Sequence, residues 1–348
     1  MLERLSARIE KSWYQNKWWN IWLLPLSAIF FLMSHARRIW LTDIAKVSKN
    51  NQIPVVIIGN INVGGTGKTP LTCRLVELLN AQSIKVGIIS RGYGSNAPHY
   101  PYALEKGESA SIVGDEPKLL RDRLDCPIVI GPDRNEAIKL LSKQDVDLIL
   151  SDDGLQHYKM ARDYEIVVLD AKRKLGNNWL LPAGPLREGG WRLKTVDTVI
   201  LNGAERLDKS ESLNNIEYEE YGMGIVPSAW VNAKTGERKL LDFFAGKALH
   251  AVVGIGNPQR FFTTLDSLAV KYKEHVFADH HAFTETDLDI ANEYSQCIVM
   301  TEKDWVKCAA FANENMWYLE VDAQLSATLE NKLMNDLTAL VRSSKTEH

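Results

Sequence analysis

The sequence has little cysteine and no excess of charge of either sign. Its four cysteines, Cys73, Cys126, Cys297 and Cys308, include no CxxC pair, so neither a zinc site nor a disulfide framework is predicted, and a reducing compartment fits best. The 41 basic and 44 acidic residues leave a formal net charge of -3. Because the field of the whole molecule cannot attract a polyanion, we expect no nucleic-acid partner and only local binding of any polyanion.

The chain also lacks an apolar run long enough to cross a bilayer comfortably. The run from Ile21 to Met33 is interrupted by Pro25 and is shorter than the ~20 residues of a spanning helix. The 348 residues are 45% hydrophobic and 24% charged, which is typical of a water-soluble globular protein with room for two domains. Disordered and many-spanning proteins are therefore excluded.

The first forty residues differ in composition from the rest. They hold five of the ten tryptophans, namely Trp13, Trp18, Trp19, Trp22 and Trp40, and basic residues lie on both sides of the apolar run. Indole rings favour the headgroup level and basic residues favour anionic lipid, so we predict a helix in the membrane interface, with residues 1–40 contacting the membrane surface. A helix packed on its own domain and a signal peptide cleaved after Ala36 are the alternatives.

Short, nearly continuous β-branched runs recur after residue 44. Such runs are typical of strands buried on both faces of a parallel sheet, and helix-like stretches lie between some of them. The first set of expected strands is 55–58, 86–89, 128–130, 148–150, 166–169 and 199–201. A second set is 249–255, 298–301 and 317–321, with helices at 288–294 and 327–340.

A glycine-rich loop follows the first expected strand and precedes a helical pattern. It runs Gly59-Asn60-Ile61-Asn62-Val63-Gly64-Gly65-Thr66-Gly67-Lys68-Thr69-Pro70. Strand, glycine loop and helix in this order are typical of a P-loop, whose backbone amides surround the phosphates of ATP. We predict that ATP is bound by Asn62, Val63, Gly64, Gly65, Thr66, Gly67, Lys68 and Thr69, with Lys68 reaching the β and γ phosphates and Thr69 holding Mg²⁺. Asn62 replaces the usual first glycine, and asparagine tolerates left-handed conformations.

Two carboxylates end the expected strand at 148–150. Asp152 and Asp153 follow Leu148-Ile149-Leu150-Ser151, and ligands bind at the carboxyl ends of strands in open α/β sheets. We predict that Asp152 binds Mg²⁺ and that Asp153 supports the metal or the nucleophile.

These elements predict an α/β fold with a P-loop NTPase-type parallel sheet domain and a smaller α/β C-terminal domain. The expected units are a membrane-associating helical segment at 1–44, a P-loop kinase domain at 45–220, a β-hairpin linker at 221–244 and the C-terminal domain at 245–348. The linker contains the turn Asn232-Ala233-Lys234-Thr235-Gly236, which separates two strand-like pieces.

Further polar clusters follow the expected strands or lie in loops. They are Ser90-Arg91-Gly92-Tyr93-Gly94, Gly114-Asp115-Glu116-Pro117, Asp152-Asp153-Gly154-Leu155-Gln156-His157, Leu186-Arg187-Glu188, Asp279-His280-His281 and Thr301-Glu302-Lys303-Asp304. Together with the glycine loop, this ordered set resembles the tetraacyldisaccharide 4′-kinase family of lipid A biosynthesis over nearly the whole chain. Leu155, Ala278 and Trp305 depart from the family pattern, but none removes a group that the chemistry needs.

The resemblance implies a kinase that transfers the γ-phosphate of ATP, with Mg²⁺, to the 4′-hydroxyl of a tetraacylated disaccharide 1-phosphate. The implied location is the cytoplasmic face of a Gram-negative inner membrane, and no protein partner is implied. By the same analogy Asp115 is the base, His280 assists it, and Glu188 is an outer Mg²⁺ contact. The candidates for binding the 1-phosphate are Arg91, Arg134 and Arg187, each of which could equally form a structural ion pair.

The residues alone leave two other functional classes of protein open. A P-loop ATPase of the partitioning or metallochaperone type has a similar glycine loop, and a membrane-docked nucleotide-binding module would have no chemistry. The clusters around Asp115 and Asp279-His280 favour the kinase over both.

Overall fold

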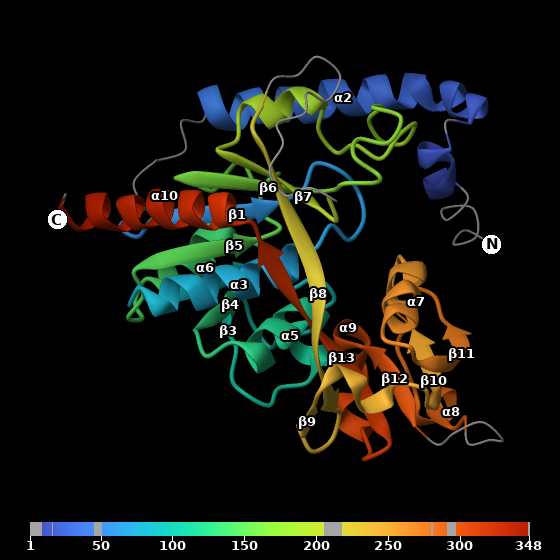
Figure 1. Ribbon diagram of the computed structural model, residues 1–348. Coiled ribbons are helices and arrows are strands. Elements are labelled where there is room, and N and C mark those ends of the chain that lie inside the picture. Colours follow the sequence, from blue (N-terminus) through green and yellow to red (C-terminus); the bar gives the residue numbers. More distant parts are fainter. Residues whose placement is uncertain are drawn as a thin grey trace.

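The structure is a computed structural model that describes residues 9–15, 17–44, 51–204, 218–279, 281–290 and 297–346. One mixed, mostly parallel sheet of 13 strands runs through the molecule (Figure 1), in the order β11-β10-β12-β13-β8-β7-β6-β1-β5-β2-β4-β3, with β9 paired to β8. Helices cover the sheet, and the predicted α/β class is confirmed.

The first half of the sheet contains the six expected strands. They are β1 (Val55–Gly59), β2 (Val86–Ser90), β4 (Ile128–Ile130), β5 (Leu148–Asp152), β6 (Tyr164–Asp170) and β7 (Thr198–Asn202). Neighbours among them pair in parallel, and nearly all their residues are buried. A two-residue strand at the edge, β3 (Tyr102–Ala103), pairs antiparallel with β4.

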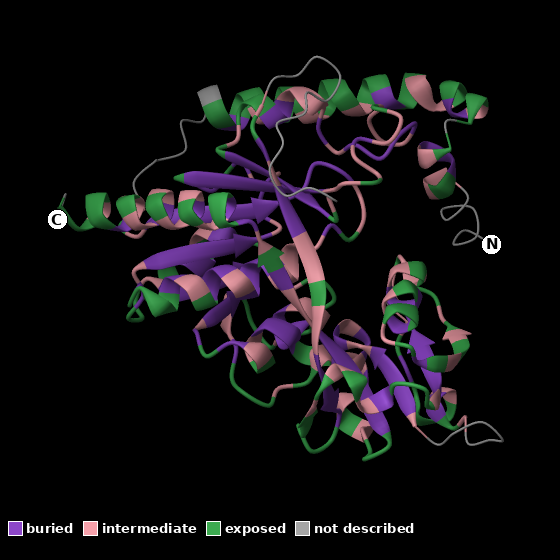
Figure 2. Cartoon of the chain, viewed as in Figure 1, coloured by how far each residue is buried: buried purple, intermediate pink, exposed green. Residues whose placement is uncertain are grey.

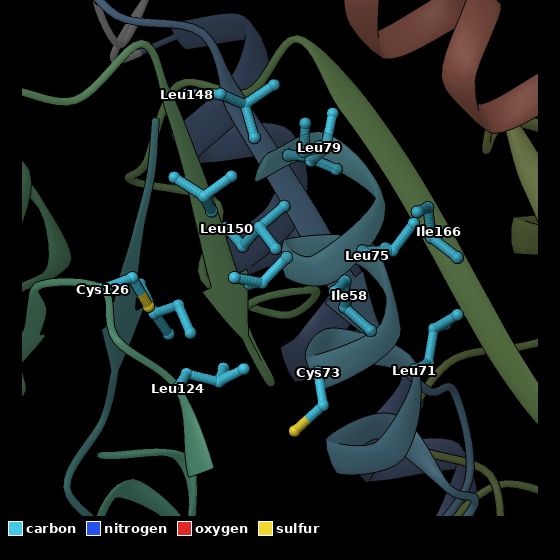
Figure 3. Packing of buried hydrophobic residues seen from close by; sticks show 14 of the residues in the cluster. Ile58, Leu71, Cys73, Leu75, Leu79, Leu124, Cys126, Leu148, Leu150 and Ile166 are labelled. Atoms are coloured by element: carbon cyan, nitrogen blue, oxygen red, sulfur yellow. The ribbon is translucent and has the colours of Figure 1, made fainter. Parts of the chain in front are cut away.

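The helices of the first half include one that follows the glycine loop directly. They are α3 (Lys68–Ala81), α4 (Ala110–Val113), α5 (Asp115–Arg123) and α6 (Arg134–Leu141), followed by the 3₁₀ helix η3 (Gly190–Lys194). Leu71, Leu75 and Leu79 of α3 repeat every four residues, so they share one helix face. Figure 3 shows this face packed against Ile58 and Leu150 of the sheet. The packing places the first turn of α3 at the carboxyl end of β1.

A long strand, β8 (Glu220–Asn232), joins the two halves of the sheet. Its first residues pair in parallel with β7, and most of its length pairs antiparallel with β13 (Met316–Leu325). The hairpin turn after β8 leads to β9 (Arg238–Lys239). Figure 1 shows β8 and β13 crossing from one half of the molecule to the other.

The second half adds three parallel strands and short helices. The strands are β10 (Ala248–Val253), β11 (Lys271–Val276) and β12 (Ile298–Thr301), and the helices are η4 (Leu241–Phe244), α7 (Pro258–Ser267), α8 (Glu285–Leu288), α9 (Glu302–Cys308) and η5 (Ala309–Phe311). The strands expected at 249–255, 298–301 and 317–321 are present as β10, β12 and β13, although β10 ends at Val253 and not at residue 255, whereas β11 was not predicted. Of the helix expected at 288–294, only Leu288 is helical, as the last residue of α8, whereas residues 289–290 are not helical and residues 291–294 lie outside the described residues.

The last helix returns to the first half of the molecule. The helix predicted at 327–340 is present as α10 (Ala327–Thr346), and its buried residues Leu329, Leu333, Leu337 and Val341 join the same apolar core as Val56 and Ile58. The predicted boundary between the kinase domain and the C-terminal domain stays a prediction. One sheet continues across residue 245, and α10, from the C-terminal part of the chain, packs on the core of the first half.

The N-terminal segment consists of a short helix and a separate, longer helical stretch that lies against the first half of the molecule (Figure 1). Residues 9–14 are helical, and η1 (Trp18–Leu23), α2 (Leu24–Ile39) and a π-helical turn, η2 (Trp40–Ile44), follow. By length and composition the helix from Trp18 to Thr42 could cross a membrane, so the helix is longer than its apolar run indicated. Residues 1–8 of the predicted membrane segment lie outside the described residues.

The four cysteines all lie among the described residues, and no disulfide joins them, which agrees with the prediction of no disulfide framework. Burial raises the pKa of the thiols of Cys73, Cys126 and Cys308, so they act as small apolar side chains.

Candidate active site

The glycine loop leads directly into helix α3. Gly67 has φ +94° and lies immediately before the helix, and Gly64 has φ +112°. A side chain on Gly67 would collide with the Asn202 amide, so the loop needs glycine here for both its conformation and its packing. The free amides of the first turn of α3 are then available to bind an anion at the carboxyl edge of the sheet.

A neighbouring segment holds the loop in place from the other side. The amide of Val63 donates to the carbonyl of Pro185 at 2.9 Å, and Asn62 Nδ2 donates to the carbonyl of Lys174 at 3.1 Å. Asn62 is buried, and the left-handed positions in the loop are occupied by glycines and not by Asn62. Asn62 therefore anchors the loop, and its contact with ATP stays a prediction.

Lys68 and Asp153 form the ionic centre of the site. Lys68 Nζ lies 3.4 Å from Asp153 Oδ1, and Arg187 NH1 lies 3.5 Å from Asp153 Oδ2. Burial opposes ionisation of Asp153, but Lys68 and Arg187 outweigh it and lower the pKa of this carboxyl. Asp153 is therefore a carboxylate held between two cations.

Asp152 is the more deeply buried carboxyl of the pair. Burial, together with the nearby charge of Glu116, raises the pKa of Asp152 to about 7. Its Oδ1 has no hydrogen-bond partner in the described part of the chain. A buried carboxylate oxygen without a partner is a suitable ligand for a hard cation such as Mg²⁺. The residues present therefore fit the predicted Mg²⁺.

Of the three arginines proposed to bind the 1-phosphate, two lie beside these carboxylates. Arg187 pairs with Asp153, and the buried Arg134 donates from NH2 to the backbone carbonyl of Asp152 at 3.0 Å. Burial lowers the pKa of Arg134 to about 10. Arg91 is exposed.

Glu188 lies next to the glycine loop but already has several partners. It accepts a hydrogen bond from Tyr158 Oη, and Gln156 Nε2 and Arg192 Nε lie 3.4 and 3.7 Å from its Oε2. Gln156 Nε2 also donates to the carbonyl of Asn60 at 3.0 Å. The described contacts tie Glu188 to the loop, and its role as an outer Mg²⁺ contact stays a prediction.

Asp115 begins helix α5 on the other side of the site. The residue before it, Gly114, has φ +91°, and a Cβ there would lie 2.6 Å from the carbonyl oxygen of Tyr93. The clusters at 90–94 and 114–117 are therefore in contact, which the sequence did not show. Lys303 Nζ of α9 pairs with Glu116 Oε1 at 3.1 Å. His280 lies outside the described residues.

Sequence reasoning missed a second group of residues that link the loop to the rest of the molecule. Asn202 Nδ2 donates to the carbonyl of Thr66 at 2.8 Å, and Arg260 NH2 of α7 donates to Asn202 Oδ1 at 2.9 Å. Asn202 ends β7 at the carboxyl edge of the sheet, and a polar residue at this position could have been recognised from the sequence as a candidate for the site. Arg260 lies in an ordinary helix, and nothing local in the sequence marks it.

Comparison with known proteins agrees with this geometry. The family model described as Tetraacyldisaccharide-1-P 4'-kinase matches residues 19–338. The chain is similar to the protein named tetraacyldisaccharide 4'-kinase from Colwellia psychrerythraea, at 46% identity over 97% of this chain and 98% of the relative, and to that from Photobacterium profundum, at 43% identity over 95% and 96%. The crystal structure of LpxK from Aquifex aeolicus in complex with ATP superposes with a TM-score of 0.75 at 27% identity, covering 92% of this chain and 99% of that one. With its phosphate loop, its paired aspartates and these matches, the chain belongs to the tetraacyldisaccharide-1-P 4'-kinase family.

Proposed function

We propose that this protein transfers the γ-phosphate of ATP to the 4′-hydroxyl of a tetraacyldisaccharide 1-phosphate in lipid A biosynthesis. One observation carries the proposal: Lys68, at the end of the glycine loop, lies 3.4 Å from Asp153 Oδ1, and the neighbouring Asp152 has a buried Oδ1 without a hydrogen-bond partner among the described residues. The loop, this cation and the paired carboxylates together form a site for the phosphates of a donor. The ATP-bound relative and the family match support the same reaction.

The chain's own residues divide the work between donor and acceptor. Lys68 neutralises charge on the transferred phosphate, and the amides of the loop hold the remaining phosphates. Asp115, at the start of α5, orients the acceptor hydroxyl and accepts its proton. Bound at Asp152 and Thr69, Mg²⁺ would supply further charge neutralisation for the phosphates. Asp153 stays ionised because Lys68 and Arg187 flank it.

Transfer of label from γ-³²P-ATP tests the reaction directly. With the purified full chain, Mg²⁺ and a tetraacyldisaccharide 1-phosphate in mixed micelles, the label is expected on the lipid at the 4′ position. Release of all the label as inorganic phosphate would instead favour the ATPase class. The family match argues against that class.

The exposed face of the N-terminal helix supports a membrane-associated enzyme. Trp18, Trp22, Ile29 and Met33 are exposed and lie along one stripe at helical spacing. Figure 2 shows α2 largely exposed along its length. An exposed apolar stripe of this extent is typical of a membrane or protein contact, and the acyl chains of the proposed substrate favour the membrane.

The opposite face of this helix is attached to the protein. Ser27 Oγ donates to the carbonyl of Leu180 at 2.8 Å and accepts from the amide of Ala183 at 3.0 Å, and the Arg38 guanidinium lies 4.3 Å from the ring centroid of Trp191. The helix thus lies across the first half of the molecule (Figure 1). This attachment favours a helix lying in the interface over one that spans, and we place the enzyme peripherally at the cytoplasmic face of the bacterial inner membrane.

Removing apolar side chains from the exposed stripe is expected to release the protein from vesicles. Wild type should co-sediment with anionic vesicles, and high salt should weaken binding without abolishing it. At ~1.5–3 kcal/mol for each fully buried side chain, a Trp22→Ser, Ile29→Ser, Met33→Ser variant should bind at least about tenfold more weakly. Leu240→Ser is the matched control, since Leu240 is 78% exposed, like Trp22 at 76%, but lies in the second half. Equal binding by wild type and the triple variant would contradict the membrane assignment.

Gly114→Ala is expected to impair the acceptor side without affecting ATP binding. Gly114 has φ +91° and ψ 155°, a region that is nearly restricted to glycine and costs other residues about 1–3 kcal/mol. The new methyl group would also push against the carbonyl of Tyr93 and displace Asp115. A misplacement of this kind should lower kcat by about tenfold to a hundredfold, whereas the Kd for ATP, measured by calorimetry, should stay within twofold. A large loss of ATP affinity would instead assign the start of α5 to the nucleotide site.

A further inference from the structure

Helix α9 is fixed rigidly to the second half of the molecule. Thr301 caps it, with its Oγ1 accepting from the amide of Asp304 at 3.1 Å. Asp304 is fully buried, accepts from the amide of Gly254 at 3.1 Å and pairs with Lys307 Nζ at 3.0 Å. Because these contacts hold the helix to the end of β10, its remaining side chains have a defined position.

Two adjacent residues of α9 reach opposite ends of α5. Glu302 Oε2 lies 3.2 Å from Arg123 NH1 at the C-terminal end of α5, and Lys303 Nζ lies 3.1 Å from Glu116 Oε1 at its N-terminal end. Arg123 NH1 also donates to the carbonyl of Val321 in β13 at 2.7 Å. The helix that begins with Asp115 is thus bound at both ends to the second half, by ion pairs of opposite polarity.

The end held by Lys303 carries the groups assigned to the acceptor. Burial opposes the charged form of Lys303, but Glu116, Asp279 and Asp115 outweigh it and raise the pKa of the ammonium group. Lys303 is therefore a half-buried, charged lysine that pairs with Glu116 Oε1 at 3.1 Å and is further favoured by the charges of Asp115 and Asp279. Glu116 and Asp115 come from α5, and Asp279 follows β11.

We propose that Lys303 is a positioning residue that bridges α9 to Glu116 and thereby holds Asp115 against the acceptor hydroxyl. This role rests on the proposed function. Lys303 does not act on the phosphate itself, and its effect on turnover passes through Glu116 and the start of α5.

A double-mutant cycle tests whether Lys303 acts through Glu116. Lys303→Met should lower kcat by about tenfold to a hundredfold and change KM for ATP by less than about threefold. Glu116→Gln should lower kcat comparably, and the double variant should be no worse than the more impaired single variant, since both remove the same bridge. Lys303→Arg, which keeps the charge, should recover most of the turnover.

Lys139→Met is the matched control. Lys139 pairs with Glu136 at 2.7 Å within α6 and is exposed, so the change removes one lysine and one ion pair without affecting α5. Its kcat should equal that of wild type. If Lys303→Met does not fold by circular dichroism, Lys303→Gln takes its place in the cycle.

Several results would overturn the proposal. Wild-type kcat in Lys303→Met would show that the bridge is dispensable. Effects of Lys303→Met and Glu116→Gln that multiply would show that Lys303 contacts the substrate independently. A loss confined to KM for ATP would place Lys303 in the nucleotide site.

Hydrogen exchange separates this proposal from the proposed function, because it needs no acceptor. Lys303→Met should increase amide exchange in residues 115–123, whereas Lys139→Met should leave it unchanged. Unchanged exchange in α5 would overturn the bridge even if the lipid is phosphorylated. Failure of the wild-type protein to label the lipid would overturn the proposed function. The bridge between Lys303 and Glu116 would then still be tested by amide exchange in α5.

Discussion

Lys68→Ala is expected to lower kcat for lipid phosphorylation by about 10³-fold or more, on the scale seen when a single cation is removed from a phosphoryl-transfer site. Lys68 begins α3, and its ammonium group lies 3.4 Å from both Asp153 Oδ1 and Asn60 Oδ1. Its side chain is only 14% exposed, so water cannot easily replace the lost charge. Rates are measured with γ-³²P-ATP and the lipid acceptor at saturating Mg²⁺.

The fold should survive this change, because Arg187 still pairs with Asp153 at 3.5 Å. Circular dichroism and thermal unfolding check this point. Lys139→Ala removes an exposed lysine from α6 and should retain full activity. If Lys68→Ala kept most of the wild-type kcat with the lipid acceptor, the glycine loop would not be the donor site.

The parallel part of the fold could be predicted because each strand is buried on both faces. Continuous runs such as Val55–Ile58 and Ile166–Leu169 carry that signal locally. Strand β11 (Lys271–Val276) lacks it, since among the described strands it pairs with β10 alone and most of its residues are exposed. A polar edge strand leaves no apolar run to recognise.

The long-range arrangement could not be predicted from local patterns. The stripe of Leu329, Leu333 and Leu337 predicts a helix with one apolar face, but nothing in it shows that this face packs on the core around Val56 and Ile58. That placement follows from β13, which pairs antiparallel with β8 and returns the chain to the first half. The order of the strands in the sheet shows that the chain returns to the first half, whereas the local sequence does not.

The donor side of the site was more predictable than the acceptor side. Lys68 and Asp152-Asp153 belong to short motifs whose spacing reflects one strand, one loop and one helix. Lys303 and Arg260 contact the site from α9 and α7, far along the chain from the loop. Their roles depend on how the two halves meet, and no local pattern encodes that contact.

Asp115→Asn should lower kcat by about 10²- to 10⁴-fold, the usual contribution of a general base. Asparagine has nearly the same shape and can still accept one hydrogen bond, but it cannot accept the proton of the acceptor hydroxyl. Asp115 follows Gly114 at the start of α5, away from the glycine loop in the sequence, and precedes Glu116, which pairs with Lys303. Its loss should therefore act mainly in the transition state.

The effects of Asp115→Asn on kcat and on the Kd for ATP, compared with each other, decide the role of Asp115. The Kd for ATP, measured by calorimetry in the absence of lipid, should change by less than about threefold, since an isosteric change here removes no phosphate contact. Asp122→Asn is the matched control, because Asp122 lies on the same helix and pairs with Lys118 within it; it should keep wild-type turnover. If Asp115→Asn left turnover intact but weakened ATP binding, Asp115 would belong to the nucleotide site, and the base would have to be sought elsewhere around the acceptor.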